Sequence, residues 1–430
     1  MKLLKISEHK KLPKECENID FSISKIKFNS LKLLKNEKQD NGQIKRAGYK
    51  IGYCWCDENI ALYVAPKEDE GKRANFQKMF EECLEDKEIA EKITAEGNKI
   101  YELFLEEPKI EIKSKNDEIT IILIMHFLIL VENIVKKGLK KGYIDISENL
   151  WGKIKGKISI KETIRRNHFK SRLDKTVCNF QKFTVDCIEN RILKLALYKS
   201  KLYINKYKNF NNFEKLENIL AFNMNAFEFV SLTDINLKDF KKVKHSPFYQ
   251  EYKYAIKLAY TIFRKLGFSL YEKKDEEIRN YVYPFYIDMS KLFELYVELK
   301  LKEAGISNIS SQEKINISKE CEEFGMKEIR PDFLISEKKW ILDAKYKYWF
   351  KDEQSSRFKD DFSQIALYGR SKGIRDHLKL EDGEIPSLIF VYPTLEEGYE
   401  NIPITFNSKE EDQCFYEFYK IKLTLPFIKI

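Results

Sequence analysis

The chain of 430 residues is too long for one ordinary hydrophobic core, so its length predicts two or three domains. Hydrophobic residues make up 43% of it and charged residues 34%, which excludes a disordered chain and is typical of a soluble globular protein. The formal net charge of +9 is modest for this length and by itself identifies no binding partner.

The first 150 residues predict a small, β-rich domain of α+β type. The basic N-terminus lacks the apolar run of a signal peptide. Helical apolar spacing is found over 76–105 and over 127–142, where Gly142 would end the second helix. Alternating apolar runs between Gly- and Asn-rich breaks predict strands of a small sheet, namely FSISKIKF (21–28), AGYKIGYCW (47–55) and NIALYVAP (59–66).

The most apolar stretch, residues 119–131, has 13 residues. A helix needs about 20 residues to cross a bilayer, so we interpret this stretch as a buried element and expect no membrane association. We interpret His126 within it as a core histidine rather than a metal ligand. The eight cysteines form no Cys-x-x-Cys pair and no zinc-like spacing with the five histidines, so we expect free thiols in a reducing cytoplasm.

Residues 151–275 predict a basic, mainly helical middle region. Between Trp151 and Phe210, 16 Lys and Arg stand against 4 Asp and Glu, a local net charge of +12. Such a block attracts phosphate backbones through counterion release, although a solvated, Lys-rich helix face explains it equally well. Apolar residues recurring at three and four positions predict helices over 186–208 and 249–266.

Residues 276–430 predict an α/β domain. Residues 289–305 fit a helix with one apolar face that ends at Gly305. A second helical stretch, over 362–372, lies between the last two of three compact β-type runs. These runs are PDFLI (331–335), KWILDAKY (339–346) and PSLIFVYP (386–393). A helix followed by strand, strand, helix and strand is an α/β core.

The run RPDFLISEKKWILDAKYK (330–347) has the pattern of a β-hairpin, in which two apolar strands flank the polar turn 336–339. If the turn is centred between Glu337 and Lys338, residues that face each other across the hairpin have numbers that add up to 675. Asp332 and Asp343 are such a pair, so their Cβ atoms are expected about 4.5–5.5 Å apart. Lys345 lies two residues beyond Asp343, which places it on the same face of the strand.

Two carboxylates this close repel each other unless one is protonated or a cation bridges them. Oxygen ligands alone suit Mg²⁺, with Mn²⁺ as a substitute. Asp332, Asp343 and Lys345 therefore predict a site that polarises a phosphodiester, activates water and stabilises the developing charge. The alternative is an exposed hairpin with an ordinary Asp–Lys ion pair, which leaves the apolar character of the strand around Asp343 unexplained.

The Pro-Asp run followed by Asp-x-Lys resembles the PD-(D/E)xK nuclease superfamily. The resemblance implies a further acidic residue on the preceding helix, and Glu294 fits this place as a catalytic residue and metal ligand; a surface glutamate is the alternative. Gln364 and Tyr368 share one helix face and resemble the Gln-x-x-x-Tyr element of RecB-like members, which supports the site and the DNA end. Core packing explains Tyr368 nearly as well.

Longer segments resemble McrC, the nuclease subunit of McrBC-type modification-dependent restriction systems. In chain order they are GYCWCDENIALYVAPK (52–67), LWGKIKGKISIKETIRR (150–166), VCNFQKFTVDCIENRILKLAL (177–197), IDMSKLFELYV (287–297), RPDFLI (330–335), ILDAKYK (341–347) and SQIALYG (363–369). The third contains an Asp-x-x-x-Asn-Arg-x-x-Lys pattern formed by Asp186, Asn190, Arg191 and Lys194. The N-terminal match is loose, with Ala-Pro-Lys where the family usually has Leu-Pro-Lys.

The McrC resemblance implies a DNA endonuclease subunit with a PD-(D/E)xK core over 276–430. It further implies that the N-terminal domain (1–150) joins a hexameric McrB-like AAA+ GTPase, and that the complex cuts double-stranded DNA chosen by the partner. The sequence agrees in having no Gly-x-x-x-x-Gly-Lys-Ser/Thr motif, so we expect no nucleotide on this chain. The basic block from 151 to 210 would then face either duplex DNA or an acidic partner surface.

Two other functions fit the same residues. One is a stand-alone RecB-like repair nuclease that acts on DNA ends without partner or GTP. The other is a non-enzymatic activator that organises the GTPase ring, a role that would not need the intact set of Asp332, Asp343 and Lys345.

Overall fold

The computed structural model divides the chain into two compact units, one formed by residues 1–117 with 279–430 and the other by residues 118–278. The predicted three-part division at residues 150 and 275 stays a prediction, while the α+β, multidomain class is confirmed. The structure describes residues 2–8, 10–13, 29–34, 47–94, 100–112, 118–207, 214–243, 247–267, 280–316, 328–347, 356–403 and 416–429.

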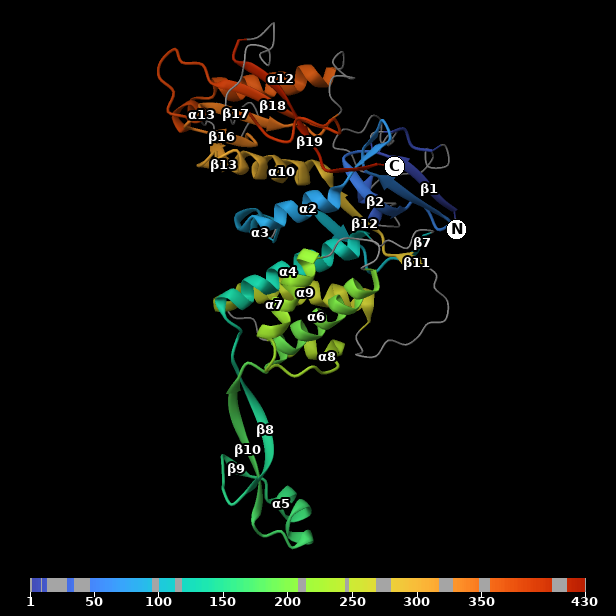
Figure 1. Ribbon diagram of the computed structural model, residues 1–430, viewed down its shortest axis with the longest axis vertical. Helices are drawn as coiled ribbons and strands as arrows, with labels where there is room; N and C mark the ends of the chain where they lie inside the picture. The colour runs from blue at the N-terminus through green and yellow to red at the C-terminus, as the bar shows by residue number, and fades with distance from the viewer. Residues whose placement is uncertain are drawn as a thin grey trace. The chain divides into compact units, whose positions relative to one another are not determined.

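The N-terminal sheet of the first unit has the strand order β1-β3-β2-β12-β6 (Figure 1). Its strands are β1 (Lys2–Ser7), β2 (Lys50–Trp55), β3 (Ile60–Ala65), β6 (Tyr101–Leu103) and β12 (Phe285–Asp288). β1 runs parallel to β3, and the other neighbours are antiparallel. The predictions for β2 and β3 are confirmed, and the basic N-terminus proves to be a strand. The strand predicted over 21–28 lies outside the described residues.

The helix predicted over 76–105 is two helices followed by a strand. Helix α2 (Phe76–Glu85) begins after Asn75, whose side chain accepts a hydrogen bond from Lys78 N at 3.1 Å. Helix α3 (Lys87–Thr94) begins after Asp86, whose carboxylate accepts from Ile89 N at 2.9 Å. The end of the predicted helix forms β6 because it pairs with β12, a partner that local spacing does not reveal.

The C-terminal sheet of the first unit has the order β13-β16-β17-β18-β19. Its strands are β13 (Ile309–Ser311), β16 (Phe333–Ile335), β17 (Trp340–Ala344), β18 (Ser387–Thr394) and β19 (Phe418–Thr424). β16 is antiparallel to β13 and β17, whereas β18 is parallel to β17 and β19. The strands predicted in this region are confirmed.

Helices α10 (Met289–Glu303), α12 (Ser356–Arg370) and α13 (Lys372–His377) accompany this sheet, and Figure 1 shows α10 and α12 on opposite sides of it. α10 ends as predicted, because Gly305 has a left-handed φ of 80° and donates to Lys302 O at 2.9 Å. The core beneath α12 and α13 contains Leu334, Ile341, Ile365, Tyr368, Ile374, Leu378, Phe390 and Phe418.

Short pairings complete the first unit. Strand β20 (Phe427–Lys429) returns the end of the chain to β5 (Lys72–Ala74), next to β4 (Glu68–Asp69). The other elements are β7 (Ile110–Ile112) paired with β11 (Asn280–Val282), β14 (Ile315–Asn316) paired with β15 (Glu328–Ile329), and the 3₁₀ helix η1 (Asn29–Leu33).

The second unit has a helical core made of α4 (Glu118–Lys137), α6 (Ile188–Tyr207), α7 (Glu214–Ala226), α8 (Leu237–Phe240), the 3₁₀ helix η3 (Pro247–Tyr249) and α9 (Gln250–Leu266). Helices α6 and α9 confirm the predictions. α4 ends before Gly138, which has a φ of 98°, rather than at Gly142. In the described part of the chain, α4 is the helix long and apolar enough to cross a membrane, and most of that stretch is buried against other helices.

His126 lies within α4 and is buried. Burial lowers the pKa of its imidazole to about 4, so the side chain is neutral at physiological pH. This agrees with its interpretation as a core residue.

Residues 142–184 form an arm that the prediction of a mainly helical middle region missed. Its strands are β8 (Gly142–Trp151), β9 (Lys157–Ile158) and β10 (Lys175–Thr184), in the order β8-β10-β9, with α5 (Ile160–Arg166) and the 3₁₀ helix η2 (His168–Lys170). Figure 1 shows β8 and β10 as a long ribbon leading away from the helices of the same unit, with α5 at its far end. Much of the basic block therefore lies on this arm.

Candidate functional site

The hairpin of β16 and β17 has the predicted register. Each residue pair between the two strands, such as Phe333 with Leu342, has residue numbers that add up to 675. The turn occupies residues 336–339 and closes with Lys339 at a left-handed φ of 57°. Continuing the register by one residue places Asp332 opposite Asp343, as expected from the sequence.

Asp332 lies in the bend before β16, with its carboxylate directed at the end of β17. Its Oδ2 accepts a hydrogen bond from Ala344 N at 2.8 Å. Its Oδ1 accepts one from Gln312 Nε2 at 3.0 Å, and the side chain of Asp343 lies within hydrogen-bonding reach. The backbone thus holds one oxygen of Asp332 beside the second carboxylate.

Lys345 joins the same group through its ammonium. Lys345 Nζ lies 2.5 Å from Asp343 Oδ2 and 3.8 Å from Oδ1 of Asp361 on α12. Asp361 also pairs with Lys347. Asp343 is only 5% exposed, which makes this pair a buried ion pair rather than the exposed one of the alternative reading.

Glu294 is connected to the two aspartates by Gln312, a residue that the sequence alone did not identify. Gln312, directly after β13, donates from Nε2 to Glu294 Oε2 at 3.2 Å and to Asp332 Oδ1 at 3.0 Å. Its backbone also donates to Asp332 O at 2.9 Å. Glu294 therefore belongs to the cluster, although it is joined to Asp332 by an amide rather than by direct contact.

Gln364 and Tyr368 lie on one face of α12, as their spacing predicts. Gln364 Oε1 accepts from Lys345 Nζ at 3.4 Å, and its Nε2 donates to Tyr368 OH at 2.7 Å. Tyr368 OH in turn donates to Arg330 O at 3.2 Å. The ring of Tyr368 is buried in the core, so this residue both packs and takes part in the polar chain that ends at Lys345.

Two of these residues were missed at the level of sequence. Asp361 lies three residues before Gln364 and therefore on the same helix face, a spacing that could have identified it. Gln312 has no comparable signal, because its place beside Asp332 depends on the pairing of β13 with β16.

Burial and mutual repulsion change the proton affinities of these groups. Burial, together with the nearby charges of Asp343 and Glu294, raises the pKa of Asp332 well above its usual range. Burial, followed by Asp288 and Asp343, raises the pKa of Glu294 to about 7. For Lys345 burial is the largest single effect and lowers the pKa of the ammonium, but the hydrogen bond to Asp343 and the charges of Asp343, Asp361 and Asp332 together outweigh it and raise that pKa.

The carboxyl groups are the kind of oxygen ligand that a hard cation prefers, but in this structure they are not spaced to coordinate one. Among the described residues, no group of three or more His, Cys, Asp or Glu side chains is arranged to hold a metal ion. Lys345 contacts Asp343, and Gln312 contacts the other two carboxyls. The set nevertheless consists of oxygen donors whose charged forms are disfavoured by one another, a condition that a divalent cation relieves.

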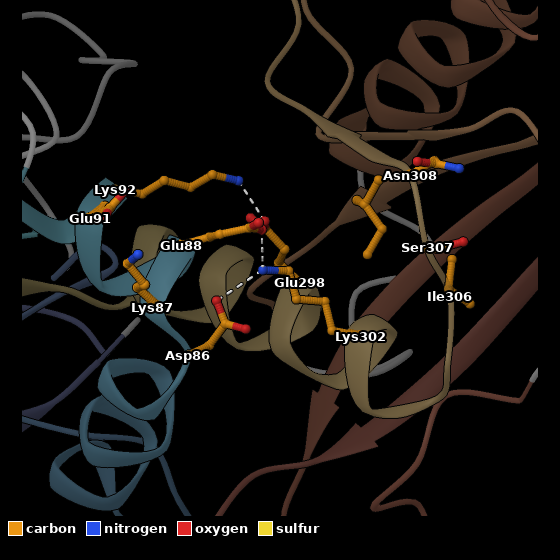
Figure 2. Close-up of a pocket in the computed structure, with 11 residues that line it drawn as sticks. Asp86, Lys87, Glu88, Glu91, Lys92, Glu298, Lys302, Ile306, Ser307 and Asn308 are labelled. Atoms are coloured by element: carbon orange, nitrogen blue, oxygen red, sulfur yellow. Dashed lines mark hydrogen bonds and ion pairs between the residues drawn. The ribbon is translucent and has the colours of Figure 1, made fainter.

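A cavity of about 1000 Å³ lies in the same unit, between α3, α10 and the segment before β13 (Figure 2). Two of its three lysines form ion pairs: Lys92 Nζ lies 2.5 Å from Glu298 Oε1, and Lys302 Nζ lies 2.9 Å from Asp86 Oδ1. Lys92 also donates to Ser311 Oγ, the residue before Gln312. The hydrogen bond from Lys92 to Ser311 therefore supports the segment that carries Gln312. None of the six predicted site residues lines the cavity.

The residues of the Asp-x-x-x-Asn-Arg-x-x-Lys pattern form a hydrogen-bonded network in the second unit, here called the brace. Asp186 accepts from Arg191 at 2.8 and 2.7 Å and from the backbone and hydroxyl of Ser231, both at 2.8 Å. Lys194 donates to three backbone carbonyls that follow α7. Asn190 donates to Lys140 O at 2.9 Å and to Val185 O at 2.6 Å, and accepts from Tyr252 OH at 2.7 Å. The pattern therefore fixes the base of the arm to the helices.

Comparisons with known proteins bear on the chain as a whole. The structure of Thermococcus gammatolerans McrB AAA+ hexamers with bound McrC aligns with 98% of this chain and 94% of its own, at 14% identity and a TM-score of 0.41. The cryo-EM structure of the McrBC complex of the same organism aligns with 71% of this chain and 89% of its own, at 16% identity and a TM-score of 0.34. No curated protein matches the sequence.

The family comparison is made with the amino-acid sequence itself. Residues 46–378 match the family model described as the McrBC 5-methylcytosine restriction system component. This range includes the hairpin with Asp332 and Asp343, the helix with Glu294 and the Gln364–Tyr368 face. The chain belongs to the McrBC 5-methylcytosine restriction system component family, as the resemblance to McrC predicted.

Proposed function

We propose that the chain is the McrC-type nuclease subunit of a restriction complex, a Mg²⁺-dependent endodeoxyribonuclease that hydrolyses phosphodiester bonds in double-stranded DNA. The observation that carries the proposal is the convergence of Asp332, Asp343 and Lys345 at one end of the β16–β17 hairpin, with Glu294 joined to them through Gln312. Membership of the McrBC family supports the same reaction class.

Each side chain has a distinct role in this proposal. Asp332 and Asp343 would hold Mg²⁺, or Mn²⁺ in its place, with Glu294 as a further ligand. The bound cation would supply Lewis-acid activation of the phosphate and of a water. Lys345 is held beside Asp343 and places a permanent positive charge where negative charge develops on the phosphoryl oxygens. Gln364 accepts a hydrogen bond from Lys345 and so orients its ammonium.

We also propose a hexameric McrB-like AAA+ GTPase as the partner and the cytoplasm as the compartment. Family membership supports the partner, and the sequence has no Walker A motif of its own, so GTP would be hydrolysed on the partner. The N-terminal domain is the proposed contact. The basic residues of the arm are suited to either DNA phosphates or an acidic surface of the partner, and both remain predictions.

The test compares Asp343→Asn and Lys345→Met with the unchanged chain, each assembled with the partner in GTP and Mg²⁺. Both variants should lower cleavage by about 100-fold or more, because each removes a charge that acts on the transition state. Assembly and GTPase stimulation should stay intact. Asp382→Asn, in an exposed turn of the same unit, is the matched control and should cut normally. Cleavage at the normal rate by Asp343→Asn or Lys345→Met would refute the site.

The same experiment separates the two other functions. The Gln364–Tyr368 pair beside Lys345 is the observation that favours a RecB-like nuclease, which would cut DNA ends without partner or GTP. If the protein is a non-enzymatic activator, the unchanged chain should stimulate the GTPase but should not cut DNA in the presence of Mg²⁺.

A further inference from the structure

Two ionisable side chains, one acidic and one basic, are buried at one edge of the N-terminal sheet. Glu8 follows β1 and is 0% exposed, and Lys67 follows β3 and is 4% exposed. Because β1 and β3 are parallel, with Ser7 opposite Ala65, both residues leave the sheet at the same edge. Glu8 N donates to Ala65 O at 3.0 Å, which fixes its backbone there.

Both side chains meet Tyr346, the residue directly after Lys345. Tyr346 OH donates to Glu8 Oε1 at 3.3 Å, and Lys67 Nζ lies 3.8 Å from the centre of the Tyr346 ring. Tyr346 is itself 2% exposed. A hydrogen bond to a carboxylate and a cation over the ring face constrain the position and the tilt of an aromatic side chain at once.

Tyr346 connects this buried cluster to two elements of the nuclease site. Through the backbone it continues the segment of Asp343 and Lys345, where Lys345 N donates to Val391 O at 2.9 Å. Through its ring it packs at 5.6 Å against Phe293, the neighbour of Glu294 on α10. Movement of Tyr346 would therefore displace both the ammonium of Lys345 and the helix that carries Glu294.

Hydrophobic packing alone would not require these charges. Burial raises the pKa of Glu8 to about 8 against the opposing effect of Lys67, and burial lowers the pKa of Lys67 to about 7 against the opposing effect of Glu8. Burial thus disfavours the charged form of each side chain, and apolar residues of similar size often serve a fold as well as buried ionisable groups do. The charges are better explained by the orientation that they impose.

We propose that Glu8, Lys67 and Tyr346 form a positioning cluster for the nuclease site, which holds the segment after β17 so that Lys345 and Asp343 face Asp332. The inference rests on the proposed nuclease function. It gives the N-terminal sheet a part in positioning the nuclease site, because two of the three residues follow strands of that sheet.

The test uses Tyr346→Phe, Glu8→Gln and Lys67→Met in the full chain. Tyr346→Phe removes only the hydroxyl and its hydrogen bond to Glu8, so the melting temperature of each variant is measured beside its activity to separate a loss of positioning from a loss of folded protein. Lys72→Met is the matched control, since Lys72 Nζ lies 4.3 Å from the ring centre of Phe427 in the β20-β5-β4 sheet and makes the same kind of contact. The measurements are kcat and KM for DNA with the partner present, and Mn²⁺ affinity of the chain alone by electron paramagnetic resonance.

A positioning role predicts that Tyr346→Phe, Glu8→Gln and Lys67→Met each lower kcat or Mn²⁺ affinity by about 10- to 100-fold, the usual effect of losing an outer-sphere support. KM for DNA should stay unchanged. Tyr346→Phe and Glu8→Gln should be non-additive when combined, because they remove the same hydrogen bond. Lys72→Met should behave as the unchanged chain.

Two failures are distinguishable. In the first, the unchanged chain binds Mn²⁺ and cuts DNA, and Lys345→Met does not cut. If Tyr346→Phe then matches the unchanged chain in kcat and in Mn²⁺ affinity, the positioning cluster is refuted and the proposed function stands. If no preparation cuts DNA, the proposed function fails, and the Mn²⁺ affinities of the variants alone decide whether the cluster orders the carboxyls.

Discussion

The carboxyls of Glu294, Asp332 and Asp343 lie in a partly buried space together with the ammonium of Lys345. Burial is the largest cause of the raised pKa values of Asp332 and Glu294, and repulsion by the negative charge of Asp343 raises both further. Gln312 reduces this repulsion by donating to two of them. At the residue scale the cluster is therefore an arrangement that gains from a bound cation.

This repulsion predicts the pH dependence of stability in the metal-free protein. The pKa of Glu294 is raised from 4.5 to about 7, so between these values the folded state binds more protons than the unfolded state. The free energy of unfolding should consequently fall as pH rises from about 4.5 to about 7, and Mg²⁺ should raise the melting temperature more above this window than below it.

The check is thermal unfolding across this pH range, with Glu294→Gln beside the unchanged chain. The variant should show a shallower decline of melting temperature with pH, because its amide does not ionise. An identical decline in both proteins would show that Glu294 does not titrate in this window.

At this scale the sequence predicts residues whose partners are set by local geometry. Asp332 and Asp343 could be paired because a four-residue turn determines the register of a hairpin. Gln364 and Tyr368 could be paired because a helix repeats every three to four residues. Gln312 could not be predicted, since its contact with Asp332 follows from the pairing of β13 with a strand more than twenty residues later.

Among the elements, the base of the arm depends on one buried amide. Asn190 is fully buried and joins the ends of the arm, at Lys140 and Val185, to Tyr252 on α9. Removing it leaves two carbonyls and a hydroxyl without this partner. Asn190 thus couples the arm to the helical core through hydrogen bonds that an apolar side chain cannot replace.

Asn190→Ala should lower the free energy of unfolding by about 1–3 kcal/mol, the cost of leaving buried polar groups unsatisfied. Urea denaturation followed by circular dichroism measures this change. Asn225→Ala, on an exposed face of α7, should stay within about 0.5 kcal/mol of the unchanged chain. Equal effects at both positions would contradict the brace.

Elements were predicted where their own pattern decides them, and missed where a distant partner does. β1 is short and basic, and its pairing with β3, more than fifty residues later, makes it a strand. β8 and β10 are long and pair with each other, but they bury little, with one buried residue in β8 and two in β10. The alternation of half-buried and exposed positions at the start of β8 was a strand signal that the prediction of a helical region did not use. Helices α6, α9 and α10 have clear apolar spacing and were predicted within a few residues.

At the scale of the whole molecule, the second unit is inserted into the first. The chain leaves the first unit after β7 and re-enters it at β11, and these strands pair directly, with Ile112 opposite Asn280. Every sheet of the first unit is formed by its own residues. The first unit should therefore fold without the inserted segment.

Replacing residues 114–278 by a four-residue Gly-containing turn should give a protein with one cooperative thermal transition and with Mn²⁺ affinity at the Asp332–Asp343 site similar to that of the full chain. The antiparallel pairing of β7 with β11 brings the two new ends to hairpin distance. Calorimetry and Mn²⁺ titration measure both properties. Aggregation or loss of Mn²⁺ binding would show that the first unit needs the insertion.

Strand β12 leads directly into helix α10, so a movement of the N-terminal sheet would also move the helix that carries Glu294. β12 is hydrogen-bonded on both edges, to β2 and β6, and Asp288 at its end caps α10 by accepting from Lys291 N at 3.3 Å. Glu294 lies six residues beyond Asp288, which is about 9 Å along a stiff helix. A tilt of about 10° at the sheet would move Glu294 by about 1.5 Å, a distance that decides whether a carboxylate reaches a cation. A ligand that twists this sheet would thereby tune metal affinity without touching the hairpin.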